Sequence, residues 1–236
     1  MYTLAIDTSN NVLGVAITTK DVVIGQISTN LKKNHSVRLM PTIDLLMKQV
    51  EIKPSQLEKI VVAKGPGSYT GVRIGLTTAK SLAWALNIPV IGVSSLEVLA
   101  YQGRFHDALI CPFFDARRGT VYTAGYIWHD GKMSCQLDET NILMTDWLDI
   151  LLKEEKEVVF LSPDMNVFYE QIKDKLGMLA VIPEAPYHIA NAAHLALAAT
   201  HYREESTHLL TPNYLRLAEA EAKWRQAQKR ENKHGG

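Results

Sequence analysis

The chain has 236 residues, of which 47% are hydrophobic and 21% are charged, as in globular proteins with a full core. Its 25 basic and 25 acidic residues balance, so net charge gives no indication of a nucleic-acid-binding protein. No run approaches the roughly 18 apolar residues of a membrane helix, and two cysteines, Cys111 and Cys135, are too few for a disulfide scaffold. We therefore expect a cytoplasmic protein that is not inserted in a membrane.

The first 93 residues alternate between strand-like and helix-like segments. Short apolar runs predict strands, and apolar residues at every third or fourth position predict helices. The expected strands are residues 4–6, 12–18, 22–27, 60–63 and 90–93, and the expected helices are residues 36–50 and 71–86. The predicted order is therefore β-β-β-α-β-α-β.

Residues 94–210 repeat this order, although their amino acids do not repeat those of the first half. Ser94-Ser95-Leu96-Glu97 has the spacing of a helix capping box, and Asp130-Gly131 is typical of a hairpin turn. Further strands are expected at 108–114, 120–128, after 131, 158–161 and 179–182, and helices at 146–153, 165–176 and 189–202. The duplication predicts an α/β protein with the duplicated ribonuclease-H-like (actin-like) fold. Its expected parts are an N-terminal lobe (1–93), a C-terminal lobe (94–210) and a tail (211–236).

A glycine-rich stretch, residues 65–75, joins a predicted strand to a predicted helix. Glycine permits close backbone approaches, and a helix N-terminus presents unpaired N–H groups. The loop could therefore hold an anion or the backbone of another protein through Gly65, Gly67, Ser68, Tyr69, Thr70 and Gly71. It lacks the Gly-Lys-Ser/Thr ending of a Walker A loop. A turn that only packs the helix against the sheet is the alternative.

Aspartates end the first strand of each half. Asp7 and Asp115 stand at matching places, where carboxylates could hold Mg²⁺ beside turn N–H groups that bind phosphate. Taken singly, an aspartate at a strand end is a turn former. Both interpretations stay open.

The motifs together resemble one family, TsaB (also called YeaZ). They occur in the family's order: Ile6-Asp7-Thr8-Ser9, His35-Ser36, residues 65–75, Gly92-Val93-Ser94-Ser95-Leu96 and Asp115-Ala116-Arg117. The resemblance implies a subunit of the bacterial machinery that makes threonylcarbamoyladenosine at position 37 of tRNA. It also implies a non-catalytic scaffold for the catalytic paralogue TsaD, joined by the ATPase TsaE, with tRNA bound through the complex.

The resemblance further implies where the paralogue binds. The two helices of the first half are expected to pack against the same elements of TsaD, through Ser36, Val37, Met40, Ile43, Met47, Arg73, Thr77 and Lys80. The 36–50 helix is apolar nearly all round, as expected of a helix that covers a sheet and also meets a partner. A homodimer through the same surface is expected when the paralogue is absent.

No cofactor of its own is expected, while ATP or ADP and Mg²⁺ would be associated with the complex. Arg117, with Asp7 and Asp115, is the candidate nucleotide contact. Ser162-Pro163-Asp164 stands where nucleotide-dependent relatives carry a glycine pair, and proline removes an N–H. No metal site is expected either, because the paralogue's His-x-x-x-His pair is reduced here to His35 and Leu39.

Two other functions remain as alternatives. A stand-alone actin-like kinase or ATPase is favoured by the aspartates and the glycine loop. A peptidase is disfavoured because Gly-x-Ser-x-Gly and His-Glu-x-x-His motifs are missing. The tryptophans are expected to pack in apolar surroundings: Trp84, Trp128, Trp147 and Trp224. The basic end is expected to be solvated or to contact an anionic partner: Lys223, Arg225, Lys229, Arg230 and Lys233.

Overall fold

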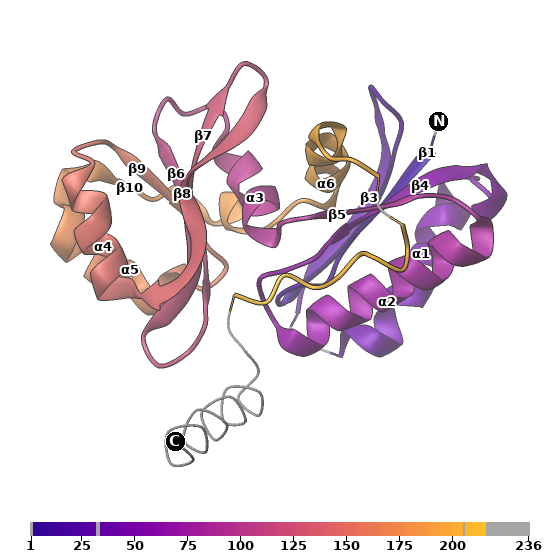
Figure 1. The fold of residues 1–236 in the computed structure, drawn as a ribbon, viewed down its shortest axis with the longest axis horizontal. Coiled ribbons are helices and arrows are strands. Elements are labelled where there is room, and N and C mark those ends of the chain that lie inside the picture. The colour runs from indigo at the N-terminus through magenta and orange to yellow at the C-terminus, as the bar shows by residue number, and fades with distance from the viewer. Residues whose placement is uncertain (1, 32–33, 205, 216–236) are drawn as a thin grey trace, which may run out of the picture.

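The computed structural model describes residues 2–31, 34–204 and 206–215, and it shows two lobes side by side, each built on a five-stranded sheet (Figure 1). The first-lobe strands are β1 (Tyr2–Asp7), β2 (Val12–Thr18), β3 (Val23–Asn30), β4 (Leu57–Ala63) and β5 (Val90–Val93). Their order across the sheet is β3-β2-β1-β4-β5. Strand β1 pairs antiparallel with β2 and parallel with β4.

The second lobe repeats this topology. Its strands are β6 (Leu109–Asp115), β7 (Thr120–His129), β8 (Lys132–Leu143), β9 (Val158–Leu161) and β10 (Ala180–Val181). The order is β8-β7-β6-β9-β10, and β6 again pairs antiparallel with the next strand and parallel with the fourth. The duplicated ribonuclease-H-like fold predicted from the sequence is therefore confirmed.

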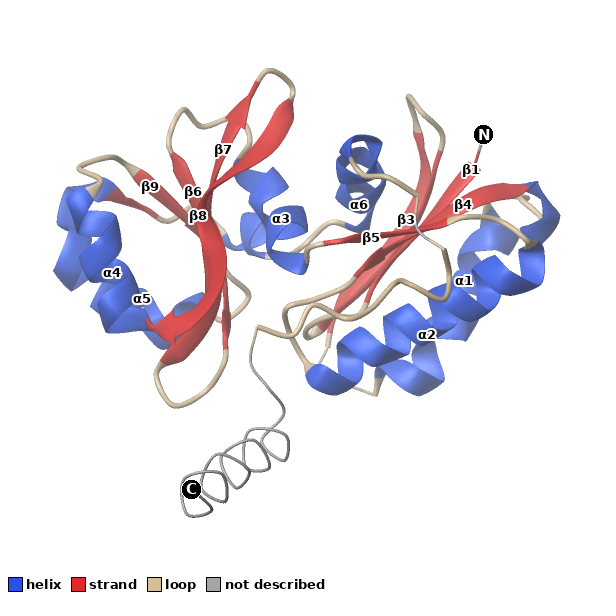
Figure 2. Cartoon of the chain, viewed as in Figure 1, coloured by secondary structure: helices blue, strands red, loops and turns tan. Residues whose placement is uncertain are grey.

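Two helices cover the outer face of each sheet (Figure 2). On the first lobe these are α1 (His35–Gln49) and α2 (Tyr69–Leu86), and on the second α4 (Met144–Lys153) and α5 (Met165–Leu176). Their apolar residues recur at helical spacing and fill a separate core in each lobe. Short 3₁₀ turns lie at Pro54–Gln56, Tyr101–Gly103, Gly177–Leu179, Ala185–His188 and Ala199–His201.

Two short helices form a central layer between the sheets. Helix α3 (Ser95–Ala100) packs on β6 and β7, whereas α6 (Ala192–Ala198) packs on β1 and β2, and the two helices contact each other. The third core cluster joins residues of both sheets through this layer, among them Ala5 and Val61 of the first lobe and Ile110 and Phe114 of the second. The lobes therefore share buried apolar surface.

The chain crosses back to the first lobe after α6. Leu210 lies in the core of the first lobe, and the strap, residues 210–214, then runs between the lobes (Figure 1). The expected division at residues 93 and 94 stays a prediction. Most of the expected tail, including its basic residues and Trp224, lies outside the described residues.

Element ends follow local capping chemistry. The Asn34 side chain accepts a hydrogen bond from Ser36 N at the start of α1, and Ser68 Oγ accepts one from Gly71 N at the start of α2. Helix α2 ends at Asn87, whose φ of 53° is the left-handed cap conformation. The expected helix at 189–202 is shorter than predicted, because Asn191 caps α6 at its start and the 3₁₀ turn Ala199–His201 replaces its C-terminal end.

Candidate functional site

The glycine loop packs tightly on the turn that follows β1. A methyl group added at Gly71 would lie 2.2 Å from the Thr8 carbonyl oxygen, and one at Gly67 would lie 2.1 Å from that of Ser9. Ser68 N donates to the Ser9 carbonyl at 2.7 Å, and Thr8 Oγ1 donates to the Gly71 carbonyl at 2.8 Å. The glycines therefore permit close contact between two backbone segments, which supports the packing interpretation of this loop.

Asp7 lies beneath this contact. Its carboxylate is 1% exposed and accepts hydrogen bonds from the backbone N and the hydroxyl of Ser9, at 2.8 and 2.7 Å. Burial raises the pKa of Asp7, opposed by the bonds from Ser9 and by the charge of His35. The other carboxylate oxygen is buried without a hydrogen-bond partner. Asp7 is thus a turn-forming residue below the surface, and it does not line the cleft described next.

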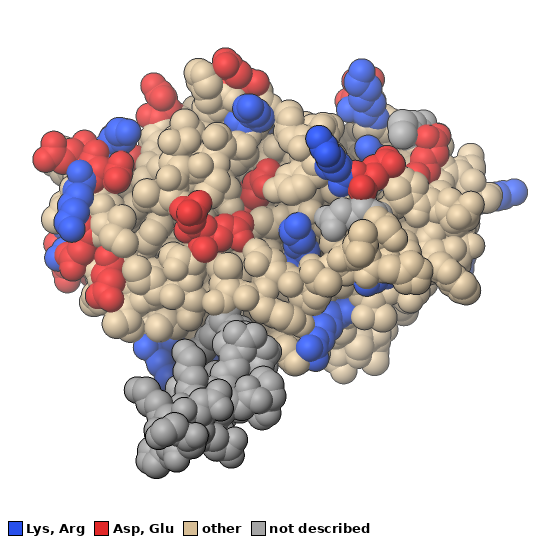
Figure 3. Space-filling view, in the orientation of Figure 1, with Lys and Arg blue, Asp and Glu red and all other residues tan. Residues whose placement is uncertain are grey.

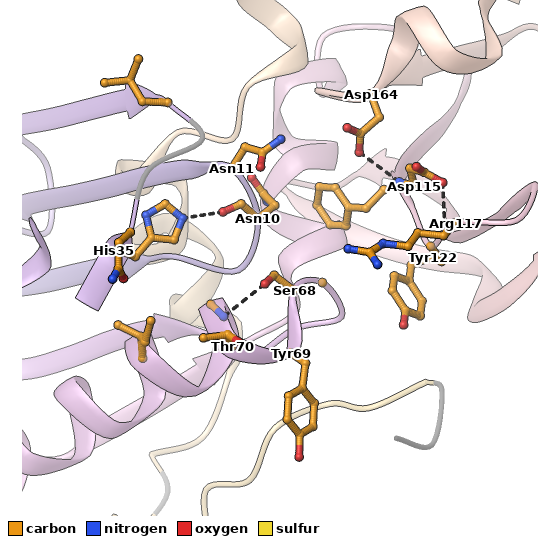
Figure 4. A pocket seen from close by; sticks show the side chains of 17 residues that line it. Asn10, Asn11, His35, Ser68, Tyr69, Thr70, Asp115, Arg117, Tyr122 and Asp164 are labelled. Atoms are coloured by element: carbon orange, nitrogen blue, oxygen red, sulfur yellow. Dashed lines mark hydrogen bonds between the residues drawn. The ribbon is translucent and has the colours of Figure 1, made fainter. Parts of the chain in front are cut away.

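A cleft of about 780 Å³ opens between the lobes (Figure 4). The first lobe contributes the loop after β1, the start of α1 and the glycine loop, and the second lobe contributes the ends of β6 and β9. Its labelled side chains are mostly polar: Asn10, Asn11, His35, Ser68, Tyr69, Thr70, Asp115, Arg117, Tyr122 and Asp164. The sequence reasoning did not single out Asn10, Asn11, Tyr122 or Asp164 as cleft residues, because their meeting depends on how the lobes are arranged.

The Asp115–Arg117 turn forms the second-lobe wall of the cleft. Asp115 Oδ1 accepts from Arg117 N at 2.8 Å, while Asp115 N donates to Asp164 Oδ2 at 3.0 Å. Burial raises the pKa of Asp164, and the charge of Asp115 raises it further against the lowering effect of that hydrogen bond. Arg117 has a left-handed φ of 68°, and Figure 4 shows its side chain extending toward Ser68.

The formal charge of the cleft is slightly negative. Asp115 and Asp164 contribute two negative charges and Arg117 one positive charge, a sum of −1 when histidine is not counted. The positive end of the α2 dipole offsets this only in part. Such a cleft disfavours a bare phosphate group but suits one that carries a divalent cation.

The second candidate surface is the outer side of α1 and α2, which lie side by side (Figure 1). Exposed apolar side chains lie on it: Val37, Met40, Leu45, Tyr69 and Trp84. Met40 is 46% exposed and Trp84 is 73% exposed. Ser36 and Thr77 are also exposed, and together with Tyr69 and Arg73 they line a groove of about 480 Å³ between the two helices.

Three sequence-based expectations for these helices are wrong. Ile43 and Met47 do not reach the outer surface, because their place on the helical repeat turns them into the core of the first lobe. Trp84 does not pack in the core, because it follows Arg73 and Thr77 on the outward face of α2. By contrast, Trp147 is buried and Trp128 packs against the shared core, as expected.

Arg73 and Lys80 contact the strap. Arg73 Nε donates to Tyr214 Oη at 2.7 Å, and the guanidinium lies 3.8 Å from the centroid of the Tyr69 ring, which stacks on Tyr214. Lys80 Nζ donates to the Leu210 carbonyl at 2.9 Å. Tyr214 and Arg73 lie 141 positions apart in the sequence, so no local pattern predicts their contact.

The described parts of the chain form neither a metal cluster nor a membrane-spanning helix. No group of three or more His, Cys, Asp and Glu side chains there has the arrangement of a metal site. No described helix has both the length and the apolar character needed to cross a membrane. On the face shown in Figure 3, acidic and basic side chains are interspersed over both lobes.

Known proteins match this chain in sequence and in fold. The family model of TsaD, tRNA N6-adenosine threonylcarbamoyltransferase, matches residues 20–224. The tRNA threonylcarbamoyladenosine biosynthesis protein TsaB of Bacillus subtilis (strain 168) is 49% identical over 229 residues, which cover 97% of this chain and 100% of that protein. The protein of the same name from Escherichia coli (strain K12) is 33% identical over 55% of this chain and 59% of its own length. The solved structure of YeaZ from Pseudomonas aeruginosa superposes with a TM-score of 0.75 at 24% identity, covering 91% of this chain and 99% of that one, which supports the fold.

Proposed function

Since the chain belongs to the TsaB family of tRNA threonylcarbamoyladenosine biosynthesis proteins, we propose that it is a non-catalytic subunit that binds a TsaD-family protein through α1 and α2. The observation that carries the binding mode is the exposed apolar surface of these helices. Monomeric proteins seldom expose several large apolar side chains together without a binding role. Met40 and Trp84 are residue types that contribute strongly at protein interfaces.

The interior of the cleft supports a scaffold rather than a catalyst. The Asp7 carboxylate accepts hydrogen bonds within its own turn, and the glycine loop packs against the β1–β2 turn. The stand-alone kinase alternative relied on these two features, so it loses most of its support. The peptidase alternative gains no support from the geometry of the cleft.

A nucleotide in the cleft is part of the same proposal. Its phosphate would be contacted by Arg117, and Asp115 would contact the Mg²⁺ that offsets the negative charge of the cleft. The cation would neutralise phosphate charge, and this chain would position it. We place this activity in the assembled complex, together with a TsaE-family ATPase and tRNA, and hence in the cytoplasm.

The binding mode can be tested by substituting two exposed methionines, one on the proposed interface and one on the second lobe. Met40→Asp places a charge on the α1 surface, and Met178→Asp places the same charge on an isolated side chain of the second lobe that is 97% exposed. Burying an unpaired carboxylate at an interface is costly, so Met40→Asp should weaken binding to the TsaD-family protein of the same organism at least about tenfold in calorimetry. Met178→Asp should bind as the unaltered protein does. Equal affinities for all three proteins would exclude this surface.

A homodimer through the same surface is proposed for the isolated chain. The same pair of variants tests it in sedimentation velocity, where Met40→Asp should be monomeric at concentrations that leave Met178→Asp dimeric. A monomer at every concentration of the unaltered protein would exclude the dimer but not the binding of the paralogue.

A further inference from the structure

The strap connects the two lobes through one residue. Asn213 N donates to the Lys64 carbonyl of the first lobe at 2.7 Å, and Asn213 Nδ2 donates to Glu139 Oε2 of β8 at 2.7 Å. On either side of it, Leu210 is buried in the first-lobe core and Tyr214 bonds to Arg73. The strap is therefore fixed to the first lobe at several points, and Asn213 joins it to the second.

Glu139 lies where the strap meets the second lobe, and it interacts with Glu97 of helix α3, which contacts β8. Glu139 is half-buried and also accepts a hydrogen bond from Tyr126 Oη at 2.7 Å. Glu97 of α3 is buried and accepts one from the Tyr202 hydroxyl. The donors to both carboxylates are neutral phenol and amide groups, so these bonds bring no positive charge to the pair.

The groups that face Glu97 come from every element packed around it. The pKa of Glu97 is raised to about 7, and burial is the largest cause. The Tyr202 hydrogen bond and the charge of Lys64 lower it, while the charge of Glu139 on β8 contributes to raising it. Glu97 in turn raises the pKa of its phenol neighbours Tyr101, Tyr126 and Tyr202, for each of which burial is the larger cause, so all three stay neutral near pH 7. Burial also raises the pKa of the Cys135 thiol, another neighbour of both glutamates, to about 11. Among these groups, Glu97 is therefore the one that exchanges its proton near neutral pH.

We propose that Glu97 and Glu139 form a proton-operated latch, which ties the strap to the second lobe when Glu97 is protonated and releases it when Glu97 ionises. A neutral Glu97 exerts no charge repulsion on Glu139, so Glu139 keeps its bond to Asn213. Ionised Glu97 repels Glu139 in a partly buried setting where water screens the charges poorly. Glu139 is the more exposed of the two and turns toward water, leaving Asn213 Nδ2.

The direction of the pH dependence follows from linkage. The closed latch is the state with the raised Glu97 pKa, so it binds the proton more tightly than the open state. Closure is therefore strongest at low pH and weakens as the pH rises through about 7. If the Glu97 pKa is one unit lower in the open state than in the closed state, the equilibrium constant for closing falls about tenfold as the pH rises through the titration.

The Asn213 side-chain amide protons report directly on the latch. Their exchange with water would be measured by NMR between about pH 5.5 and about pH 8.5, each rate divided by the intrinsic rate at that pH. Asn141 is the internal control, since its Nδ2 donates to the Val121 carbonyl at 3.2 Å in the same lobe. We expect Asn213 protection to fall about tenfold with a midpoint near pH 7 while Asn141 protection stays constant.

Three variants decide whether Glu97 is responsible. Glu97→Gln keeps the acceptor for Tyr202 and should hold Asn213 protection constant over the whole range. Glu184→Gln, which removes an equal charge from an exposed site, should keep the midpoint of the unaltered protein. Tyr202→Phe removes a bond that lowers the Glu97 pKa and should move the midpoint to higher pH.

Constant protection in the unaltered protein, or an unchanged midpoint in Glu97→Gln, would overturn the latch. The measurement uses the chain alone, so its outcome is independent of whether the chain binds a TsaD-family protein.

Discussion

At Gly71 the backbone of α2 meets the backbone of the β1–β2 turn with no space for a side chain. The Thr8 hydroxyl and carbonyl both face Gly71, and the Thr8 hydroxyl would also lie 2.6 Å from a methyl group added at Gly75. The feature that marks this sequence most clearly is therefore explained by the contact between a strand end and a helix start.

Gly71→Ala should destabilise the protein. Alanine favours a helix by about 1 kcal/mol over glycine, but the new methyl group would meet a backbone oxygen that cannot rotate away. Overpacking of this kind costs about 1–3 kcal/mol, and a contact of 2.2 Å with a backbone oxygen falls at the upper end. After the gain in helix propensity we expect a net loss of about 2 kcal/mol in the free energy of unfolding. Chemical denaturation would measure it. Thr70→Ala, at the exposed neighbouring position, should change the value by less than about 0.5 kcal/mol; an unchanged Gly71→Ala would contradict the packing interpretation.

The place of a residue within a strand or helix could be predicted from the sequence where a single local pattern determines it. Asp7 and Asp115 end their strands as expected, because each follows an unbroken apolar run. It could not predict that Asp7 would be buried and Asp115 exposed at the cleft, since that difference depends on the glycine loop covering one turn and not the other.

At the scale of elements, α1 and α2 each have an inner face that forms core and an outer face that exposes apolar side chains. The sequence showed that α1 was apolar nearly all round, but it could not assign Met40 outward and Met47 inward. That assignment depends on which side of the helix touches the sheet, and a broad apolar pattern leaves the rotation of the helix undetermined.

The strap is the element that the sequence reasoning missed. It has no helical or strand periodicity, and its anchors lie 130 or more positions away along the chain at Lys80 and Arg73. Leu209 and Leu210 are adjacent apolar residues, and the local pattern does not say which of the two is buried or what it contacts.

Leu210→Ala should detach the strap from the first lobe. The side chain is 2% exposed, so its truncation leaves a cavity that costs about 2–4 kcal/mol of unfolding free energy. Adjacent Leu209 is 74% exposed, and Leu209→Ala should cost less than about 0.5 kcal/mol. Thermal and chemical denaturation of the two variants would compare them directly. Equal effects would show that the strap is not anchored through Leu210.

At the scale of the whole molecule, the lobes are joined by the central layer of α3 and α6. Helix α6 belongs to the second half of the chain but covers the sheet of the first half, and residues of both sheets share one core cluster. The order of elements was predictable because each half follows its own periodicity. The packing of α6 on the sheet of the first half was not predictable, because periodicity does not say which sheet a helix covers.

The shared core predicts that the two lobes unfold together. Opening one lobe would expose apolar surface of the other, so scanning calorimetry should give one transition whose van't Hoff and calorimetric enthalpies agree. Two separated transitions would show that the lobes are stable independently, and would contradict a rigid scaffold.

We propose that this chain supports a reaction carried out by another subunit. The most direct test is threonine-dependent modification of tRNA in a mixture of the TsaD-family protein, the TsaE-family ATPase, the adenylate-forming enzyme, ATP and bicarbonate, with and without this chain. We expect modification only when this chain is present, a strong reduction with Met40→Asp but not with Met178→Asp, and none when the TsaD-family protein is omitted. Undiminished modification without this chain would contradict the proposed role as a subunit.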